Sequence, residues 1–237
     1  MGIGGVDGIL RSAGLLFFAF AGYARIATLG EEVDDPARTI PKAIPRALGI
    51  TLAVYAVVAV SALAAVGPEA LARSDAPLAT AVGAGDLDVL VPAVRIGGAI
   101  AALGVLLSLI AGVSRTTFAM AADRELPGWL DAVHPTRKVP HRAELAAGAL
   151  IALLAILTDL RSAIGFSAFC VLTYYAIANA SAWTLPSPQR RWPRALAAVG
   201  LIGCATLALT LPIASVVAGT GVLAVGALVW TVRHRRP

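Results

Sequence analysis

The hydrophobic and polar positions of the sequence divide it into seven apolar runs, separated by segments rich in proline, glycine and charge. The runs are Leu10–Leu29, Ala47–Val66, Val94–Ala121, Glu144–Thr158, Ile164–Leu185, Leu196–Leu211 and Ile213–Val232. An α-helix rises about 1.5 Å per residue, so most runs can cross a hydrocarbon core of roughly 30 Å. The fourth run is short and needs a thinner bilayer or a start inside the preceding loop. The pattern predicts an all-α integral membrane protein with seven transmembrane helices.

The predicted loops lie between these runs. They are Glu31–Arg46, Gly67–Pro92, Asp123–Arg142, a tight turn at Asp159–Ser162, Pro186–Arg194 and a turn at Pro212. Residues 125–141 contain Trp129 beside Pro127 and Pro135, and we expect a short interfacial helix there. An odd number of spans places the two ends of the chain on opposite sides of the membrane.

Composition narrows the class of protein. Hydrophobic residues make up 58% of the chain and charged residues only 14%, which is typical of a polytopic membrane protein. The basic residues fall between apolar runs and not on one amphipathic face, so we expect no nucleic-acid partner. Cys170 and Cys204 lie inside apolar runs and are interpreted as small buried residues. The first 15 residues lack the pattern of a removable signal peptide, so the first span is expected to act as the insertion signal.

Lysine and arginine predict the orientation of the spans. One side of the membrane collects 15 of the 19 basic residues: Arg25, Arg38, Lys42, Arg46, Arg115, Arg124, Arg137, Lys138, Arg142, Arg190, Arg191, Arg194, Arg233, Arg235 and Arg236. The other side has Arg11, Arg73, Arg95 and Arg161. The positive-inside rule makes the first side cytoplasmic. We therefore predict a multi-pass protein of the plasma membrane, with its C-terminus in the cytoplasm and its N-terminus outside.

The stretch Leu15–Arg46 begins as an apolar helix and ends as a charged loop. Within it, Phe18–Tyr23 contains Gly22, at a place where an uninterrupted membrane helix would favour alanine or leucine. A helix broken at membrane depth frees backbone groups, which are tolerated where they line a cavity or bind a ligand. The segment is therefore a candidate binding element. The alternative is that Gly22 is a close-packing point between two helices.

Two long segments resemble a known family. The segment FFAFAGYARIATLGEEVDDPARTIPKAI resembles the sixth transmembrane helix and the following cytoplasmic loop of amino acid permeases in the amino acid, polyamine and organocation (APC) superfamily. The segment SRTTFAMAADRELPGWLDAVHPTRKVPHRAE is similar to the end of their eighth helix and the loop into the ninth. The resemblance implies the second inverted five-helix repeat of a leucine-transporter-type fold over residues 1–185, with a discontinuous first span. Two additional C-terminal transmembrane helices over residues 186–237 would follow.

The resemblance covers only the later part of such a permease. The family has about twelve spans, built around inverted repeats that hold the substrate between them. Nothing in this sequence corresponds to the first five spans, whose first helix resembles a cradle for the substrate carboxylate. Three interpretations stay open: a fragment of a longer reading frame, a half whose missing N-terminal repeat comes from a partner chain, or a self-sufficient seven-helix protein.

The resemblance also implies a substrate site. The carbonyls at the end of the broken first span, near Phe18–Phe20, would receive the ammonium group of an amino acid, since this helix end is the negative end of the dipole. The expected substrate-binding residues are Phe18, Ala19, Phe20, Gly22 and Tyr23. The aromatic members would flank the substrate side chain or act as a gate, and their alternative role is ordinary helix packing.

Other polar and aromatic residues leave alternatives open. Arg25 is a possible gate or ion-pair residue, or it snorkels to the cytoplasmic interface near Glu31 and Glu32. The fifth run offers a secondary aromatic gate or packing through Phe166, Phe169, Tyr174 and Tyr175. In the third run, hydroxyl groups help to coordinate a cation or only satisfy the helix backbone; they belong to Ser108, Ser114 and Thr116.

The implied function is membrane transport of amino acids or related amines by alternating access, as the C-terminal part of a secondary-active permease that is incomplete alone. The alternative is a non-transporting membrane scaffold or regulatory half-permease. An intramembrane enzyme needs paired carboxylates or a nucleophile beside a base, and the spans contain almost none, so no enzyme is expected. We expect the lipid bilayer as a partner and no cofactor. A metal site is not expected, because His134 and His141 are separated by a proline-interrupted loop.

Overall fold

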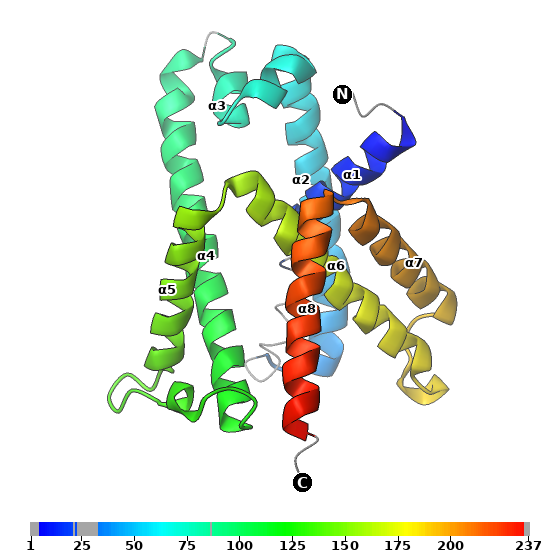
Figure 1. Ribbon diagram of the computed structural model, residues 1–237. Coiled ribbons are helices and arrows are strands. Elements are labelled where there is room, and N and C mark those ends of the chain that lie inside the picture. Colours follow the sequence, from blue (N-terminus) through cyan, green and yellow to red (C-terminus); the bar gives the residue numbers. More distant parts are fainter. Residues whose placement is uncertain (1–4, 21, 23–32, 86, 235–237) are drawn as a thin grey trace. The chain divides into compact units, whose positions relative to one another are not determined.

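The computed structural model describes residues 5–20, 22, 33–85 and 87–234, and every regular element in this part of the chain is a helix (Figure 1). Four helical segments of the described chain are long and apolar enough to cross a membrane. They are α2 (Pro36–Arg73), Asp88–Ala122 with α4 (Val91–Ala122), α6 (Leu160–Thr184) and Ile213–Val232 within α8 (Ile213–His234). The prediction of an all-α integral membrane protein is confirmed at this level, and the count of seven spans stays a prediction.

The remaining helices are shorter. Among the described residues they are α1 (Val6–Leu16), α3 (Pro77–Val82), α5 (His141–Leu157) and α7 (Arg194–Thr210), with the 3-10 helices η1 (Phe17–Phe20), η3 (Asp88–Leu90), η4 (Gly128–Asp131) and η5 (Ser187–Gln189). Helices α5 and α7 have 17 residues each and cover the fourth and sixth apolar runs. Helix α1 has 11 residues and covers only the first part of the first run.

The chain forms two compact units. One contains Met1–Gly22 and Leu150–Pro237, and the other contains Tyr23–Ala149. Helix α5 begins in the second unit and ends in the first. The predicted division of the chain into a five-helix repeat (1–185) and two additional helices (186–237) is a different division and stays a prediction.

Helix α6 is the centre of the first unit, because it contacts α1, α7 and α8. The buried core consists of Ala168, Phe169, Leu172, Ala208 and Leu211. The side chains of Leu15, Phe17 and Val216 pack against this core. The apolar face of α6 is therefore buried by three neighbouring helices of the same unit.

Glycines permit the close approach of these helices. A Cβ added at Gly165 of α6 would overlap the hydroxyl of Ser215 on α8, and one added at Gly219 of α8 would overlap the ring of Phe169 on α6. The two contacts are four residues apart on both helices, so they lie on one face of each. Small residues at such positions bring helix backbones together, as is usual in membrane proteins. The close packing of α6 on α8 therefore depends on the lack of a side chain at Gly165 and Gly219.

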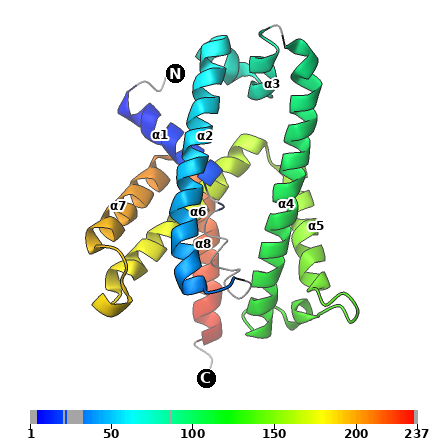
Figure 2. The same cartoon turned by 180° about the vertical axis from the view of Figure 1, so that it is seen from behind.

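In the second unit, α2 changes direction at Gly67, whose backbone has φ 76° and ψ 166°. Only glycine adopts this conformation without strain, and Pro68 follows it, so the apolar run ends at Val66 as predicted. Helix α3 then bridges the end of α2 and the start of α4 (Figure 2). A hydrogen bond of 2.6 Å between the hydroxyls of Ser74 and Thr80 closes this connection.

The segment Glu31–Arg46 differs from its prediction as a loop. Its described part is helical from Pro36 onward, so the loop prediction is wrong for these residues. Pro36 occupies the first turn, where its missing N–H costs no helical hydrogen bond. The Thr39 hydroxyl donates to the carbonyl of Asp34 at 3.0 Å and holds the helix start. The prolines and charges of this segment therefore belong to the first turns of α2 and not to a loop.

The connection between α4 and α5 contains η4, a short 3-10 helix where we expected an interfacial helix. Leu130 of η4 is buried, and Arg142 donates from Nη1 to the carbonyl of Trp129 at 3.3 Å. The rings of His134 and His141 lie edge to face with centroids 5.4 Å apart. The connection is therefore packed by its own side chains.

Asp159 caps the start of α6, since the backbone N–H of Ser162 donates to Asp159 Oδ1 at 3.0 Å. Hydrogen bonds from the side chain and backbone of Ser162 lower the pKa of Asp159 below its ordinary value of 3.8. The cap therefore stabilises the folded chain above the unfolded pKa of Asp159, and this contribution disappears as the pH falls through the folded pKa.

Asp159→Ala should lower the thermal midpoint of the purified chain at pH 7, because the cap of α6 is lost. Asp159→Asn, which keeps the cap, should keep the midpoint at pH 7 and reduce its loss in acid. Equal acid sensitivity of Asp159→Asn and wild type would contradict this role.

Candidate functional site

The candidate site begins where the first span stops being an α-helix. Helix α1 ends at Leu16, and Phe17–Phe20 continue as the 3-10 helix η1. The position of this change is close to Phe18–Tyr23, where the sequence predicted a break. Gly22 lies in a turn, and of the residues around it, 21 and 23–32 lie outside the described chain. Tyr23, Arg25, Glu31 and Glu32 therefore have no described position, and their roles stay predictions.

Two contacts with α7 fix the direction of α1. A Cβ added at Gly14 would lie 3.1 Å from Leu211 Cδ2 and 3.2 Å from the carbonyl oxygen of Leu207, so the two helices are in close contact. Arg11 also donates from Nε to the carbonyl of Thr210 at 3.4 Å. The carbonyl at the end of α7 is thereby given a charged donor. These contacts set where α1 ends and η1 begins.

Phe17 attaches η1 to the core of the first unit. Its ring packs edge to face on the ring of Tyr175, with centroids 5.7 Å apart and planes at 79°. Edge-to-face pairs of this kind contribute about 0.5 to 1.5 kcal/mol beyond their burial. Tyr175 is 5% exposed, so the pair joins η1 to the interior of α6.

The neighbours of Phe17 are oriented differently. Phe18 is 41% exposed, Ala19 is exposed and Phe20 is half-buried. A Cβ added at Gly22 would meet no atom within 4 Å. In the described chain, the ring of Phe18 is therefore not buried by the first unit, and its surface is open to a ligand or to another helix. The role of Gly22 as a binding element or as a packing point stays a prediction.

Tyr174 lies next to this group. Its ring is 5.4 Å from the ring of Tyr175, which in turn contacts Phe17, and Tyr174 itself is 58% exposed. The structure thus places Tyr174 on the part of α6 that contacts η1. Phe169 and Tyr175, by contrast, are buried and pack within the first unit, and the choice between a secondary gate and packing stays open.

The predictions from sequence missed Phe17 and assigned no separate role to Tyr175. Phe17 is the residue that fixes η1, whereas Phe18 is the one that is left exposed. The only signal for Phe17 was its place in the run LLFFAF, which does not show which of two adjacent phenylalanines points inward. The contact of Phe17 with Tyr175 of α6 shows that Phe17 is the one that points inward.

The hydroxyl groups of α4 belong to the second unit. Ser114 is fully buried and donates to the carbonyl of Ala111 at 3.1 Å, and Thr116 donates to the carbonyl of Gly112 at 3.1 Å. Both hydroxyls bond to the backbone of their own helix. This is the structural role that the sequence left open as an alternative to a cation site.

Comparison with known proteins decides the family. A family model described as "Amino acid permease" matches residues 1–232, which is nearly the whole chain. The chain belongs to this family of amino acid permeases. The match includes α1, η1 and all helices of the first unit that contact them. Membership of this family, together with the apolar helices of the described chain, shows that its setting is the membrane.

Three relatives of this chain are named as transporters or permeases. An uncharacterized transporter of Mycobacterium tuberculosis is 63% identical over 234 residues, covering 97% of this chain and 53% of the relative. A cationic amino acid transporter of Arabidopsis thaliana is 31% identical over 180 residues, covering 74% of this chain and 30% of the relative. The branched-chain amino acid permease of Bacillus subtilis is 27% identical over 197 residues, covering 83% and 42%. The chain thus spans about half the length, or less, of these relatives.

Proposed function

We propose that this permease chain contributes one wall of the substrate site of an amino acid transporter that works by alternating access. The observation that carries the proposal is the end of α1 at Leu16 and its continuation as η1 with an exposed Phe18. In transporters built from inverted repeats, discontinuous helices form the substrate site near the middle of the membrane. The change of helix type falls in the motif that resembles the broken sixth helix of the family.

The chemistry of this wall suits an ammonium group. The C-terminal end of an α-helix carries a partial negative charge of roughly half an elementary charge. Helix α1 ends with no basic side chain in its last turn, so no cation of that turn competes for this end. Phe18 and Ala19 would flank the substrate, Phe20 would support them, and the open space around Gly22 would admit the substrate backbone. Tyr23 would complete the wall.

Two residues are proposed for gating. Tyr174 is exposed on α6 and is supported by Tyr175, which also supports η1 through Phe17. A movement of η1 would therefore shift the buried ring of Tyr175, which contacts Tyr174. Arg25 is proposed as the charged partner of this gate or as an ion pair.

The substrate class is an amino acid or a related amine. The Arabidopsis relative is named for cationic amino acids, the Bacillus permease for branched-chain amino acids, and a further Bacillus relative for methylthioribose. Amino acids are common to the first two names and to the family description. The polar part of an amino acid, rather than one side chain, is therefore the proposed determinant of binding.

We also propose that a second five-helix repeat is required. Only 6% and 0% of the residues in the apolar windows of α2 and Asp88–Ala122 are buried within the described chain, so most of these residues can contact lipid or further helices. The repeat within residues 1–185 and two further helices within 186–237 would account for seven spans. The rest of the site, including the group that binds the carboxylate, would come from the other repeat.

The experiment that tests this function is uptake by a complete transporter. The half of the M. tuberculosis relative that this chain does not cover is fused upstream of residues 1–237, and the fusion is reconstituted in liposomes. Saturable, stereoselective uptake of at least one labelled amino acid from a panel of all twenty is expected. A folded, correctly inserted fusion that takes up none of them would contradict the proposal and favour a non-transporting scaffold.

The proposed orientation has the C-terminus in the cytoplasm, and its test uses two exposed sites. Ala70 follows the kink in α2, and Ser187 lies in η5. In a background with Cys170→Ala and Cys204→Ala, Ala70→Cys should react with an impermeant maleimide added to intact cells. Ser187→Cys should react only after permeabilisation, because the loop with Arg190, Arg191 and Arg194 is expected inside. The reverse labelling pattern would overturn the orientation.

A further inference from the structure

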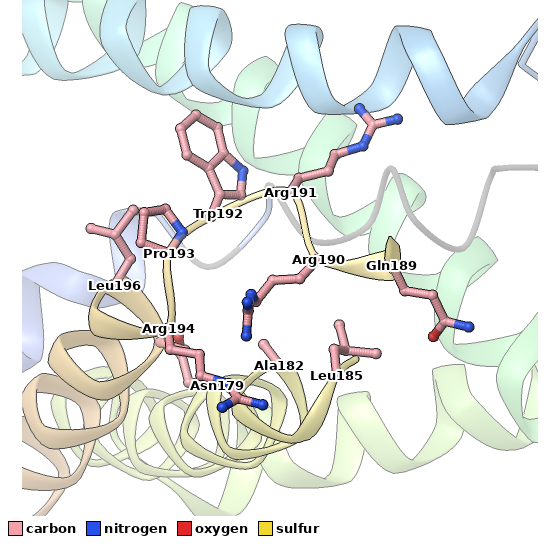
Figure 3. A pocket seen from close by; sticks show the side chains of 11 residues that line it. Asn179, Ala182, Leu185, Gln189, Arg190, Arg191, Trp192, Pro193, Arg194 and Leu196 are labelled. Atoms are coloured by element: carbon pink, nitrogen blue, oxygen red, sulfur yellow. The ribbon is translucent and has the colours of Figure 1, made fainter. Parts of the chain in front are cut away.

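A cavity of about 540 Å³ lies between the end of α6 and the start of α7. None of the residues of the proposed substrate site lines it. Figure 3 shows it from close by. It is lined by Asn179, Ala182, Leu185, Gln189, Arg190, Arg191, Trp192, Pro193, Arg194, Leu196 and Ala197. We propose that this cavity binds the phosphate of an anionic phospholipid headgroup.

The charge of the lining is the first reason. Three of the eleven lining residues are arginines, and none of them is an aspartate or glutamate. The side chains of Arg190 and Arg194 extend to the same side of the cavity, beside Ala182 and Asn179, whereas Arg191 extends away from them (Figure 3). Two guanidinium groups on one wall repel each other, and an anion between them would remove this repulsion. Arginine is the side chain best suited to a phosphate, because its planar fork donates two parallel hydrogen bonds.

The hydrogen bonding of Arg190 is the second reason. Its Nη2 lies 3.4 Å from Ser187 Oγ, which holds the guanidinium in place. Its Nη1 is buried and has no hydrogen-bond partner among the described residues. A buried charged donor without an acceptor is costly, so the conformation calls for an acceptor that the described residues do not provide. A phosphate oxygen in the cavity, reached by a small rotation of the guanidinium, would supply it.

The setting favours a lipid over a soluble anion. The cavity opens at the end of α6, a helix long and apolar enough to cross the membrane. Apolar side chains, among them Leu185 directly after α6 and Leu196 of α7, line it together with the arginines. Trp192, which is 61% exposed, lies beside them, and tryptophan is enriched at the membrane interface. A site that is basic at one side and apolar at the other matches a molecule with an anionic head and acyl chains, and basic pockets between helices recognise such lipids.

The cavity has a rigid floor. Asn179 of α6 donates from Nδ2 to the carbonyl of Tyr175 at 2.8 Å, and its side chain is in close contact with Gly200 of α7. The linker above the floor contains Pro186, Pro188 and Pro193, which restrict its backbone. The arginines are therefore presented by a linker of limited freedom on a closely packed pair of helices.

The test measures quenching of Trp192 fluorescence in the purified chain, delipidated in an uncharged detergent. Brominated phosphatidylglycerol and brominated phosphatidylcholine are titrated into wild type and Trp192→Phe, and the difference between the two proteins gives the signal of Trp192. We expect phosphatidylglycerol to bind about ten-fold or more tightly than phosphatidylcholine, because two arginines act on its charge. Equal binding of the two lipids would overturn the proposal.

Variants assign the preference to the cavity. Arg190→Gln/Arg194→Gln should reduce it to the level of phosphatidylcholine, whereas Arg137→Gln/Lys138→Gln, which removes the same charge from the exposed α4–α5 connection, should leave it unchanged. Arg194→Gln alone changes an exposed residue and should weaken the preference even if the double variant does not fold. An unchanged preference in Arg194→Gln, or an equal loss in the control, would overturn the proposal. Competition by inorganic phosphate as strong as that by short-chain phosphatidylglycerol would assign the site to a free anion instead.

Discussion

Liposomes that contain only the 237-residue chain are expected to show no saturable uptake of any amino acid, whereas the fusion with the uncovered half of the M. tuberculosis relative is expected to transport. The reason is that the chain spans 53% of that relative, and the family resemblance places the carboxylate-binding helix in the other half. A zwitterion at η1 alone would have its carboxylate unpaired, at a cost of about 2 to 5 kcal/mol. That cost weakens binding by more than about ten-fold.

The loss of movement adds to the loss of affinity. Alternating access depends on one repeat moving against the other around a shared site, and with one repeat there is no second body to move against. The measurement is uptake of a panel of labelled amino acids, compared with empty vesicles and with the fusion. Stereoselective, saturable uptake by the chain alone would show that the second repeat is dispensable.

The variant Gly219→Leu is expected to destabilise the first unit strongly. A Cβ at this position would overlap the ring of Phe169, which is 6% exposed and belongs to the core cluster. Neither α8 nor the buried ring can move without opening the contact between α6 and α8, and overpacking of this kind costs about 1 to 3 kcal/mol. The overlap begins at the Cβ itself, so the cost is expected in the upper part of this range. It then exceeds the gain of about 0.8 to 1 kcal/mol that leucine brings to a helix relative to glycine.

The matched control lies on the same helix. A Cβ at Gly221 meets no atom within 4 Å, so Gly221→Leu gains the helix preference without the clash. Thermal unfolding in detergent can be followed with a thiol-reactive dye, since Cys170 and Cys204 are both partly buried. The midpoint of Gly219→Leu should fall by about 2 to 4 °C for each kcal/mol lost. Gly221→Leu should equal or exceed wild type, and equal midpoints for the two variants would contradict the described packing of α6 on α8.

Hydropathy predicted the helices well because burial in lipid acts on each run independently. The predicted runs Val94–Ala121 and Ile164–Leu185 differ by at most four residues at either end from α4 and α6. The end of the second run at Val66 coincides with the glycine that takes a positive φ. The start of α2 was missed because prolines and charges near a helix end outside the membrane have the composition of a loop.

The candidate site was predicted only as a segment. Gly22 and the aromatic residues drew attention to the end of the first span, and η1 lies there. The contact of Phe17 with Tyr175 was not predictable, because it joins residues 158 positions apart. The same holds for Gly219 and Phe169, which pair only when α6 and α8 pack. The role of a residue that acts through a tertiary contact can be assigned only once the fold is known. A helix break, in contrast, can be predicted from neighbouring residues in the sequence.

The most direct measurement of the central claim, that the segment after α1 forms a wall of the substrate site, is amino acid uptake by the Gly22→Leu form of the fusion. Gly203→Leu in α7 is the control, because a Cβ at either glycine meets no atom within 4 Å and neither change should unfold the first unit. Gly22→Leu is expected to abolish uptake at normal expression and insertion, because the leucine side chain occupies the space of the substrate. Gly203→Leu is expected to transport like wild type. Wild-type uptake by a stably inserted Gly22→Leu protein would show that this segment is not a wall of the substrate site.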